Sequence, residues 1–110
     1  MQPIDRNTLK QWLDERRDIT PVEVLAPEKY REFHLPGAVN VPLGEGFAER
    51  IQETFPDRFQ PLAVYCYDER CTASPEAARI MEELGYQKVY DYEAGKVDWR
   101  EHGLPIELEA

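Results

Sequence analysis

The sequence is poor in cysteine and has no long apolar run. Two cysteines allow one disulfide at most, and in a reducing compartment a structural bridge is the less favoured interpretation of them. No apolar stretch approaches the length that crosses a bilayer, and the amino terminus lacks the apolar core of a signal peptide. We therefore expect a cytoplasmic protein without a membrane partner.

Basic residues are scarce relative to acidic ones. Asp and Glu number 22 against 13 Lys and Arg, which gives a formal net charge of −9 at pH 7. Because such a surface repels phosphate-rich polymers and anionic lipids, we expect no nucleic acid as a partner, whereas a protein with a basic face would be attracted. We expect a monomer or a weak homodimer.

Apolar periodicity alternates between helices and strands along the chain. Helices are expected at residues 6–17, 27–33, 46–55, 75–84 and 97–102, and strands at 22–25, 38–41, 61–66 and 88–91. Strands that alternate with helices through short connections predict an α/β fold, in which helices cover both faces of a parallel sheet. The 110 residues contain no repeat, linker or low-complexity tract, so we predict a single domain over residues 1–110.

Three polar residues receive structural interpretations. Asp5 is expected to cap the first helix. Ser74 is predicted as the N-cap of the fourth helix, with Pro75 at its first position. Glu23 interrupts an otherwise apolar strand, and we expect backbone N–H groups or an arginine to hold its carboxylate.

The stretch from Leu62 to Ala78 carries the strongest signal for chemistry. An apolar strand ends at Cys66 and a helix begins near Pro75, so the loop between them lies at the carboxyl end of a parallel strand, where α/β sheets bind ligands. Backbone N–H groups of such a loop favour an anion above the cysteine. Cys66 is the candidate nucleophile, and the candidate substrate-binding loop is Tyr67, Asp68, Glu69, Arg70, Cys71 and Thr72.

Two residues of this loop have more than one interpretation. Cys71 either fills space under the loop or acts as a resolving thiol, since a spacing of five brings two thiols together if the chain curls. Arg70 is either a solvated surface charge or an anion clamp. The two cysteines match a zinc site weakly, because no paired His spacing accompanies them, and we expect neither a metal nor a cofactor.

Several short motifs, in one order along the chain, resemble a single-domain rhodanese. They are the run 28–43, Val64-Tyr65-Cys66, Leu84-Gly85-Tyr86, Val89-Tyr90, Gly95 with Trp99, and Gly103-Leu104-Pro105. The resemblance implies a rhodanese-like fold with about five parallel strands. It also implies a sulfurtransferase in which Cys66 takes sulfane sulfur from a small donor or a protein persulfide, holds it as a persulfide, and passes it to a thiol acceptor.

The loop departs from the family form Cys-x-x-Gly-x-Arg-Ser. Cys71 stands where that form has its Arg, Arg70 lies one position earlier, and about two extra residues precede the helix. Because Asp68 and Glu69 disfavour a free dianion such as thiosulfate, a protein persulfide donor fits better.

Two other functions use the same cysteines. One is a redox-sensing or protein-binding module in which Cys66 and Cys71 report oxidation without turnover. The other is a phosphatase or arsenate reductase, which requires Cys-x5-Arg, whereas Thr72 occupies the position of that Arg here.

Overall fold

The computed structural model describes residues 1–15 and 17–109, and within them five parallel strands form one sheet in the order β1-β5-β4-β2-β3. The strands are β1 (Gln2–Ile4), β2 (Thr20–Glu23), β3 (Val39–Asn40), β4 (Leu62–Tyr65) and β5 (Val89–Tyr92). The helices are α1 (Arg6–Asp14), α2 (Pro27–Glu32), α3 (Phe47–Thr54), α4 (Ala73–Glu83) and α5 (Gly95–Glu101). The predicted α/β fold is confirmed.

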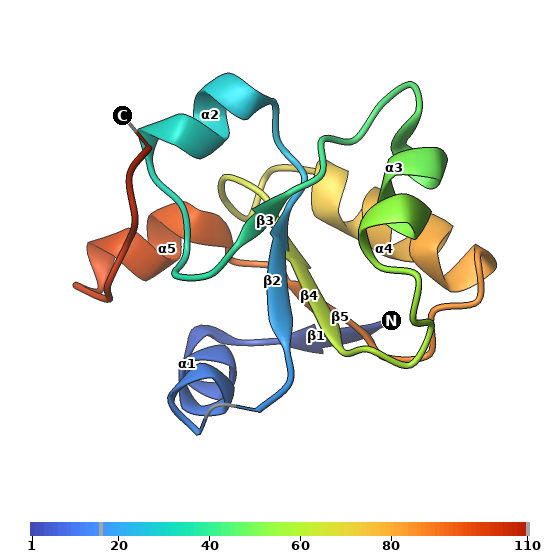
Figure 1. The fold of residues 1–110 in the computed structure, drawn as a ribbon. Helices are drawn as coiled ribbons and strands as arrows, with labels where there is room; N and C mark the ends of the chain where they lie inside the picture. Colours follow the sequence, from blue (N-terminus) through green and yellow to red (C-terminus); the bar gives the residue numbers. More distant parts are fainter. Residues whose placement is uncertain (16, 110) are drawn as a thin grey trace.

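Helices cover both faces of this sheet. Figure 1 shows α3 and α4 on one side of the strands and α1 and α5 on the other. The buried side chains accordingly form two clusters, because alternate residues of the central strand β4 point to opposite faces. Val64 belongs to the cluster under α3 and α4, and Ala63 to the cluster with Leu9 and Trp99. The sheet is therefore apolar on both faces, as expected for a parallel sheet.

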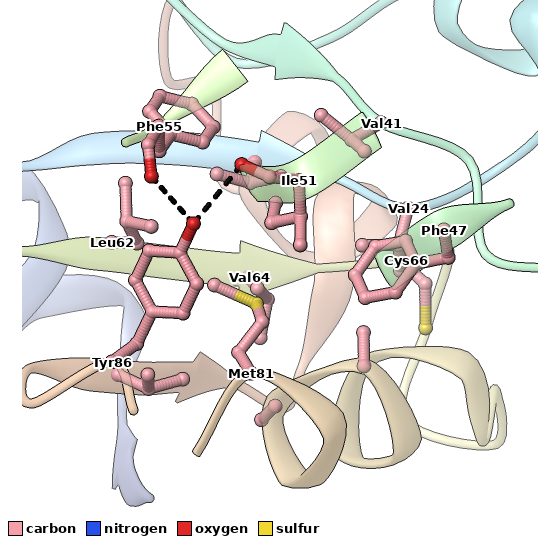
Figure 2. Close-up of a cluster of buried hydrophobic side chains, with 14 residues drawn as sticks. Val24, Val41, Phe47, Ile51, Phe55, Leu62, Val64, Cys66, Met81 and Tyr86 are labelled. Atoms are coloured by element: carbon pink, nitrogen blue, oxygen red, sulfur yellow. Dashed lines mark hydrogen bonds between the residues drawn. The ribbon is translucent and has the colours of Figure 1, made fainter. Parts of the chain in front are cut away.

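The cluster under α3 and α4 contains a buried tyrosine that joins two elements. Figure 2 shows the Tyr86 hydroxyl between the carbonyl oxygens of Ile51 and Phe55, at 3.1 and 2.5 Å. Cys66 lies at one end of the same cluster, past Val64 on the strand. The cysteine is thus continuous with the core on its inner side.

Two strands differ from the predicted pattern. β1 was not expected, since three residues that include Pro3 carry no alternation, and the strand exists because it pairs with β5 at the sheet edge. β2 begins at Thr20 and includes Pro21, although this strand was expected to begin at Val22. The missing N–H of this proline is tolerated because the short β3 pairs only with Val22 and Glu23.

The two predicted helix caps have different outcomes. Asp5 caps α1 as predicted, and its carboxylate accepts a hydrogen bond of 2.8 Å from the Thr8 N–H, which lowers the pKa of Asp5. The Ser74 prediction is wrong. Helix α4 begins at Ala73, and the Ser74 hydroxyl instead donates to the carboxylate of Asp91. A buried carboxylate loses more without a partner than an exposed helix N–H does, so the hydroxyl serves the carboxylate.

No helix among residues 1–15 and 17–109 combines the length and the apolar character that crossing a bilayer requires.

Candidate functional site

Cys66 follows directly after the central strand β4, at the carboxyl edge of the sheet. Its side chain is 1% exposed, and its sulfur forms a disulfide with Cys71, five residues further along the chain. The two Cα atoms lie 6.4 Å apart, within the range that a disulfide spans. The loop, drawn in yellow between β4 and α4 in Figure 1, therefore curls so that its second cysteine returns to the first, as one sequence interpretation required.

The backbone of this loop rests on the start of α5. The Cys66 carbonyl accepts a hydrogen bond of 3.0 Å from the Lys96 N–H, and the Tyr67 carbonyl accepts one of 3.0 Å from the Val97 N–H. Within the loop, the Cys71 N–H donates to the Asp68 carbonyl at 3.1 Å. These bonds hold the curled loop against the helix.

The cradle of N–H groups expected above Cys66 is not formed in this disulfide-linked state. Among the described residues, no hydrogen bond reaches the Cys66 sulfur, which is bonded to Cys71. The curl of the loop turns the N–H groups of Arg70 and Cys71 toward Asp68 instead. An anion on Cys66 therefore requires the disulfide to open first.

Gly95 allows the loop to approach α5 closely. Its φ of +81° lies in the left-handed region that favours glycine. A Cβ atom at this position would lie 2.5 Å from the Tyr67 carbonyl oxygen and 2.7 Å from the Asp68 nitrogen, closer than real Cβ contacts. The glycine therefore has a packing role beneath the loop as well as a conformational one.

Arg70 lies at the surface of the loop. Its side chain is 88% exposed and forms an ion pair of 3.4 Å with Asp68, so the structure favours the surface-charge interpretation over the anion clamp. Glu69 and Thr72 are also exposed. A hollow of about 260 Å³ beside the loop is lined by Asp68, Glu69 and Arg70 and by acidic residues of α5. The outer face of the loop is thus mainly acidic.

A buried ion pair lies beneath the loop, and its lysine was missed in the sequence. Lys96 and Glu23 are each 0% exposed, and the Lys96 Nζ lies 2.9 Å from a Glu23 oxygen. The ammonium also donates to the carbonyls of Lys29 and Phe33, at 2.7 and 2.8 Å, and the Tyr65 hydroxyl donates to Glu23 at 2.9 Å. The prediction that backbone N–H groups or an arginine hold Glu23 is therefore wrong.

The same pair and its hydrogen-bond partners link β2, β4, α2 and α5 at the carboxyl edge of the sheet. Burial raises the pKa of Glu23 and lowers that of Lys96, while their mutual hydrogen bond opposes both shifts. Because the backbone N–H of Lys96 also donates to the Cys66 carbonyl, the ion pair is coupled to the support of the cysteine loop. The sequence signal was the spacing of three between Lys96 and Trp99, which places both on the buried face of α5.

Asp91 is a second buried charge that sequence reasoning left without a role. It is 1% exposed, and its carboxylate accepts a hydrogen bond of 2.8 Å from the Ser74 hydroxyl. Within residues 1–15 and 17–109 no other group donates to this carboxylate. Burial raises its pKa, which the Ser74 bond opposes in part. The sequence did carry a signal for Asp91, because an acid is unusual between the apolar residues of a strand that is covered on both faces.

Comparison with known proteins identifies the family. The profile described as "Rhodanese-like domain" matches residues 5–102, so the chain belongs to the rhodanese-like domain family. The chain is similar to the thiosulfate sulfurtransferase PspE of Escherichia coli, with 40% identity over 68 residues that cover 62% of each protein. It is also similar to the HTH-type transcriptional regulator Rv0324 of Mycobacterium tuberculosis, with 35% identity over 107 residues, or 96% of this chain and 46% of the regulator.

These relatives are longer than the region they share with this chain. The chain spans less than two thirds of the length of either one. Among solved structures, the BH2092 protein from Bacillus halodurans superposes with a TM-score of 0.85 at 22% identity, over 97% of this chain and 77% of that one. At this identity the likeness shows the rhodanese-like fold, with its five-stranded parallel sheet.

Proposed function

We propose that the chain is a sulfurtransferase or sulfane-sulfur carrier that holds sulfur as a persulfide on Cys66 and passes it to a thiol acceptor. The observation that carries the proposal is the position of Cys66 in a rhodanese-like domain, directly beyond the central strand β4. Ligands of open α/β sheets bind at this edge. The similarity to a thiosulfate sulfurtransferase supports the same class of reaction.

The charge of the loop favours a protein persulfide as the donor. Asp68 and Glu69 line the hollow beside the loop together with Asp98 and Glu101 of α5. Each exposed carboxylate a few ångströms away opposes a bound dianion by about 1 kcal/mol in water. Thiosulfate is therefore expected to be a poor donor, and a donor with a basic face is expected to be a better one.

The disulfide sets the first step of the reaction. Since the Cys66 sulfur is bonded to Cys71, a thiol reductant must open this bond before Cys66 can accept sulfur. Loop residues Tyr67 to Thr72 then become free to rearrange, and their N–H groups can face the new anion.

The experiment is an intact-mass measurement on the reduced chain after incubation with a sulfane-sulfur donor. Parent, Cys66→Ser and Cys71→Ser proteins are compared under the same conditions. A mass gain of one sulfur in Cys71→Ser that is absent in Cys66→Ser is expected. An equal mass gain in the two variants would mean that another residue carries the sulfur. No mass gain in either variant would refute the proposal.

A second candidate function is a redox-sensing or protein-binding module in which Cys66 and Cys71 report oxidation without turnover. It is favoured by the closed disulfide and by the 35% identity to a transcriptional regulator. Thiol counting before and after mild peroxide tests it on the reduced chain. Loss of both thiols, in a protein that takes up no sulfur from the donor, would favour this function over sulfur transfer.

A further inference from the structure

A small cavity lies on the side of the loop that faces α4 and β5. Its volume is about 270 Å³, and Cys71, Ser74 and Asp91 line it. Cys71 is half-buried and packs against the core cluster under α3 and α4, and it also lines this cavity together with the carboxylate of Asp91. The cavity thus brings together a thiol from the loop, a hydroxyl from α4 and an acid from β5.

The acid in this cavity is unusual for a buried group. Asp91 accepts one hydrogen bond of 2.8 Å from Ser74, and no other hydrogen bond to its carboxylate is found within residues 1–15 and 17–109. Burying a carboxylate with so few partners costs stability, and such groups gather at functional sites. Burial raises the pKa of Asp91, the Ser74 hydrogen bond opposes this shift, and the charge of Glu93 adds to it.

The other titratable groups around the cavity are few. Those on lining residues are the Cys71 thiol, the carboxylates of Glu69 and Glu93, and the amino group of Met1. Glu69 and Glu93 are both exposed, so water screens their charges. Asp91 is therefore the buried acid that shares a cavity with a cysteine.

We propose that Cys71 is a resolving thiol that releases sulfide from a Cys66 persulfide, and that Asp91, held by Ser74, accepts the proton of Cys71 across this cavity. The step rests on the proposed function, since it needs a persulfide on Cys66. The Cys66–Cys71 disulfide places the Cys71 sulfur at the inner sulfur of such a persulfide.

The Asp91 carboxylate takes the proton of the Cys71 thiol, and the resulting thiolate attacks the Sγ atom of Cys66. The bond from Sγ to the outer sulfur breaks, and the outer sulfur leaves as hydrosulfide with the electron pair and its own proton. The products are the Cys66–Cys71 disulfide and a protonated Asp91. An external dithiol then supplies two electrons and two protons to restore both thiols.

This activity makes the chain a sulfide-releasing reductase of sulfane sulfur, driven by external thiols. The test is a single turnover in which the reduced chain reacts with the persulfide of a basic cysteine-containing peptide, and both sulfide and intact mass are followed. The parent is expected to release sulfide and to end as the disulfide. Cys71→Ser is expected to keep the mass gain of one sulfur and to release no sulfide.

Failure of this inference is distinct from failure of the proposed function. If the parent keeps its sulfur as stably as Cys71→Ser does, Cys66 is a carrier and Cys71 does not resolve it. If Cys71→Ser gains no sulfur at all, the persulfide itself is absent and both proposals fall.

The role of Asp91 is tested by the pH profile of sulfide release. Asp91→Asn is expected to slow release by about 10²-fold at pH values where the Cys71 thiol is protonated, because the general base is lost. The two rates should converge near pH 9, where a free thiol ionises by itself. Glu93→Gln is the comparison variant, since it removes an exposed carboxylate from the same cavity and leaves Asp91 in place. Because the charge of Glu93 raises the pKa of Asp91, this variant should shift the profile slightly toward lower pH without the loss of rate seen in Asp91→Asn.

A structural role of Asp91 would give a different result. Asp91→Asn would then lower the rate by the same factor at every pH, and parallel profiles would overturn the assignment. Ser74→Ala is expected to shift the pH profile of sulfide release and to keep its pH dependence, since the Asp91 carboxylate remains and only its hydrogen bond is lost. Unfolding curves of each variant establish that the chain is folded at every pH used.

Discussion

Replacement of Gly95 by alanine tests how closely the cysteine loop rests on α5. A Cβ atom at Gly95 would lie 2.5 Å from the Tyr67 carbonyl oxygen and 2.6 Å from its carbon, and backbone cannot move aside as a flexible side chain can. Gly103 is the matched control, because its φ of +73° is also left-handed and a Cβ atom there would meet nothing within 4 Å. Each substitution bears a left-handed backbone cost of about 1–2 kcal/mol.

The difference between the two variants isolates the contact with the loop. Both gain about 0.4–1 kcal/mol from a stiffer unfolded chain, which cancels in the comparison. Overpacking adds about 1–3 kcal/mol for Gly95→Ala alone. Urea unfolding of the disulfide-linked proteins measures both free energies of unfolding. Equal losses in the two variants would refute the close approach of Tyr67 to Gly95.

Three further substitutions test the buried polar groups. Lys96→Met leaves the Glu23 carboxylate buried without its ammonium partner, so urea unfolding should show a free energy of unfolding lower by about 3–5 kcal/mol. Adding Glu23→Gln should recover part of this loss, and strictly additive losses in the double variant would contradict the pairing. Burial raises the pKa of Asp91, so its contribution to stability is present at low pH and is lost as the pH rises through the folded-state pKa. The stability of Asp91→Asn relative to the parent should therefore increase as the pH rises above the usual pKa of an aspartate, and parallel stability curves would argue against the shift. Tyr86→Phe leaves the Phe55 carbonyl without its donor and should cost about 1–3 kcal/mol in thermal unfolding, whereas an unchanged Tm would mean that this bond adds nothing.

Local patterns explain why much of the fold was predictable. The amphipathic spacing of α4 places Ala77, Ala78 and Met81 on one face, and all three are buried. Asp5 caps α1 through a neighbour three residues away, which is a contact that the sequence itself specifies. The placement of Cys66 immediately after the central strand followed from an apolar run that ends at that residue.

Contacts between distant segments explain what was missed. β1 is a strand only because β5 lies beside it, and its three residues have no pattern of their own. Ser74 carries a sound local capping signal, but Asp91 from β5 takes its hydroxyl. Glu23 was recognised as unusual, while its partner Lys96 lies 73 residues further along the chain.

The amino-acid sequence by itself therefore determined the helices, most strands, the position of Cys66 and the acidic charge of the loop, because each depends on residues within a few positions of one another. It left two roles open for Cys71 and none for Asp91. Only the tertiary structure decided that Cys71 bonds to Cys66 and that Asp91 and Ser74 share its cavity. The physical reason is that α5 supports the loop and the sheet brings β5 beside α4, and both depend on packing between segments far apart in the chain.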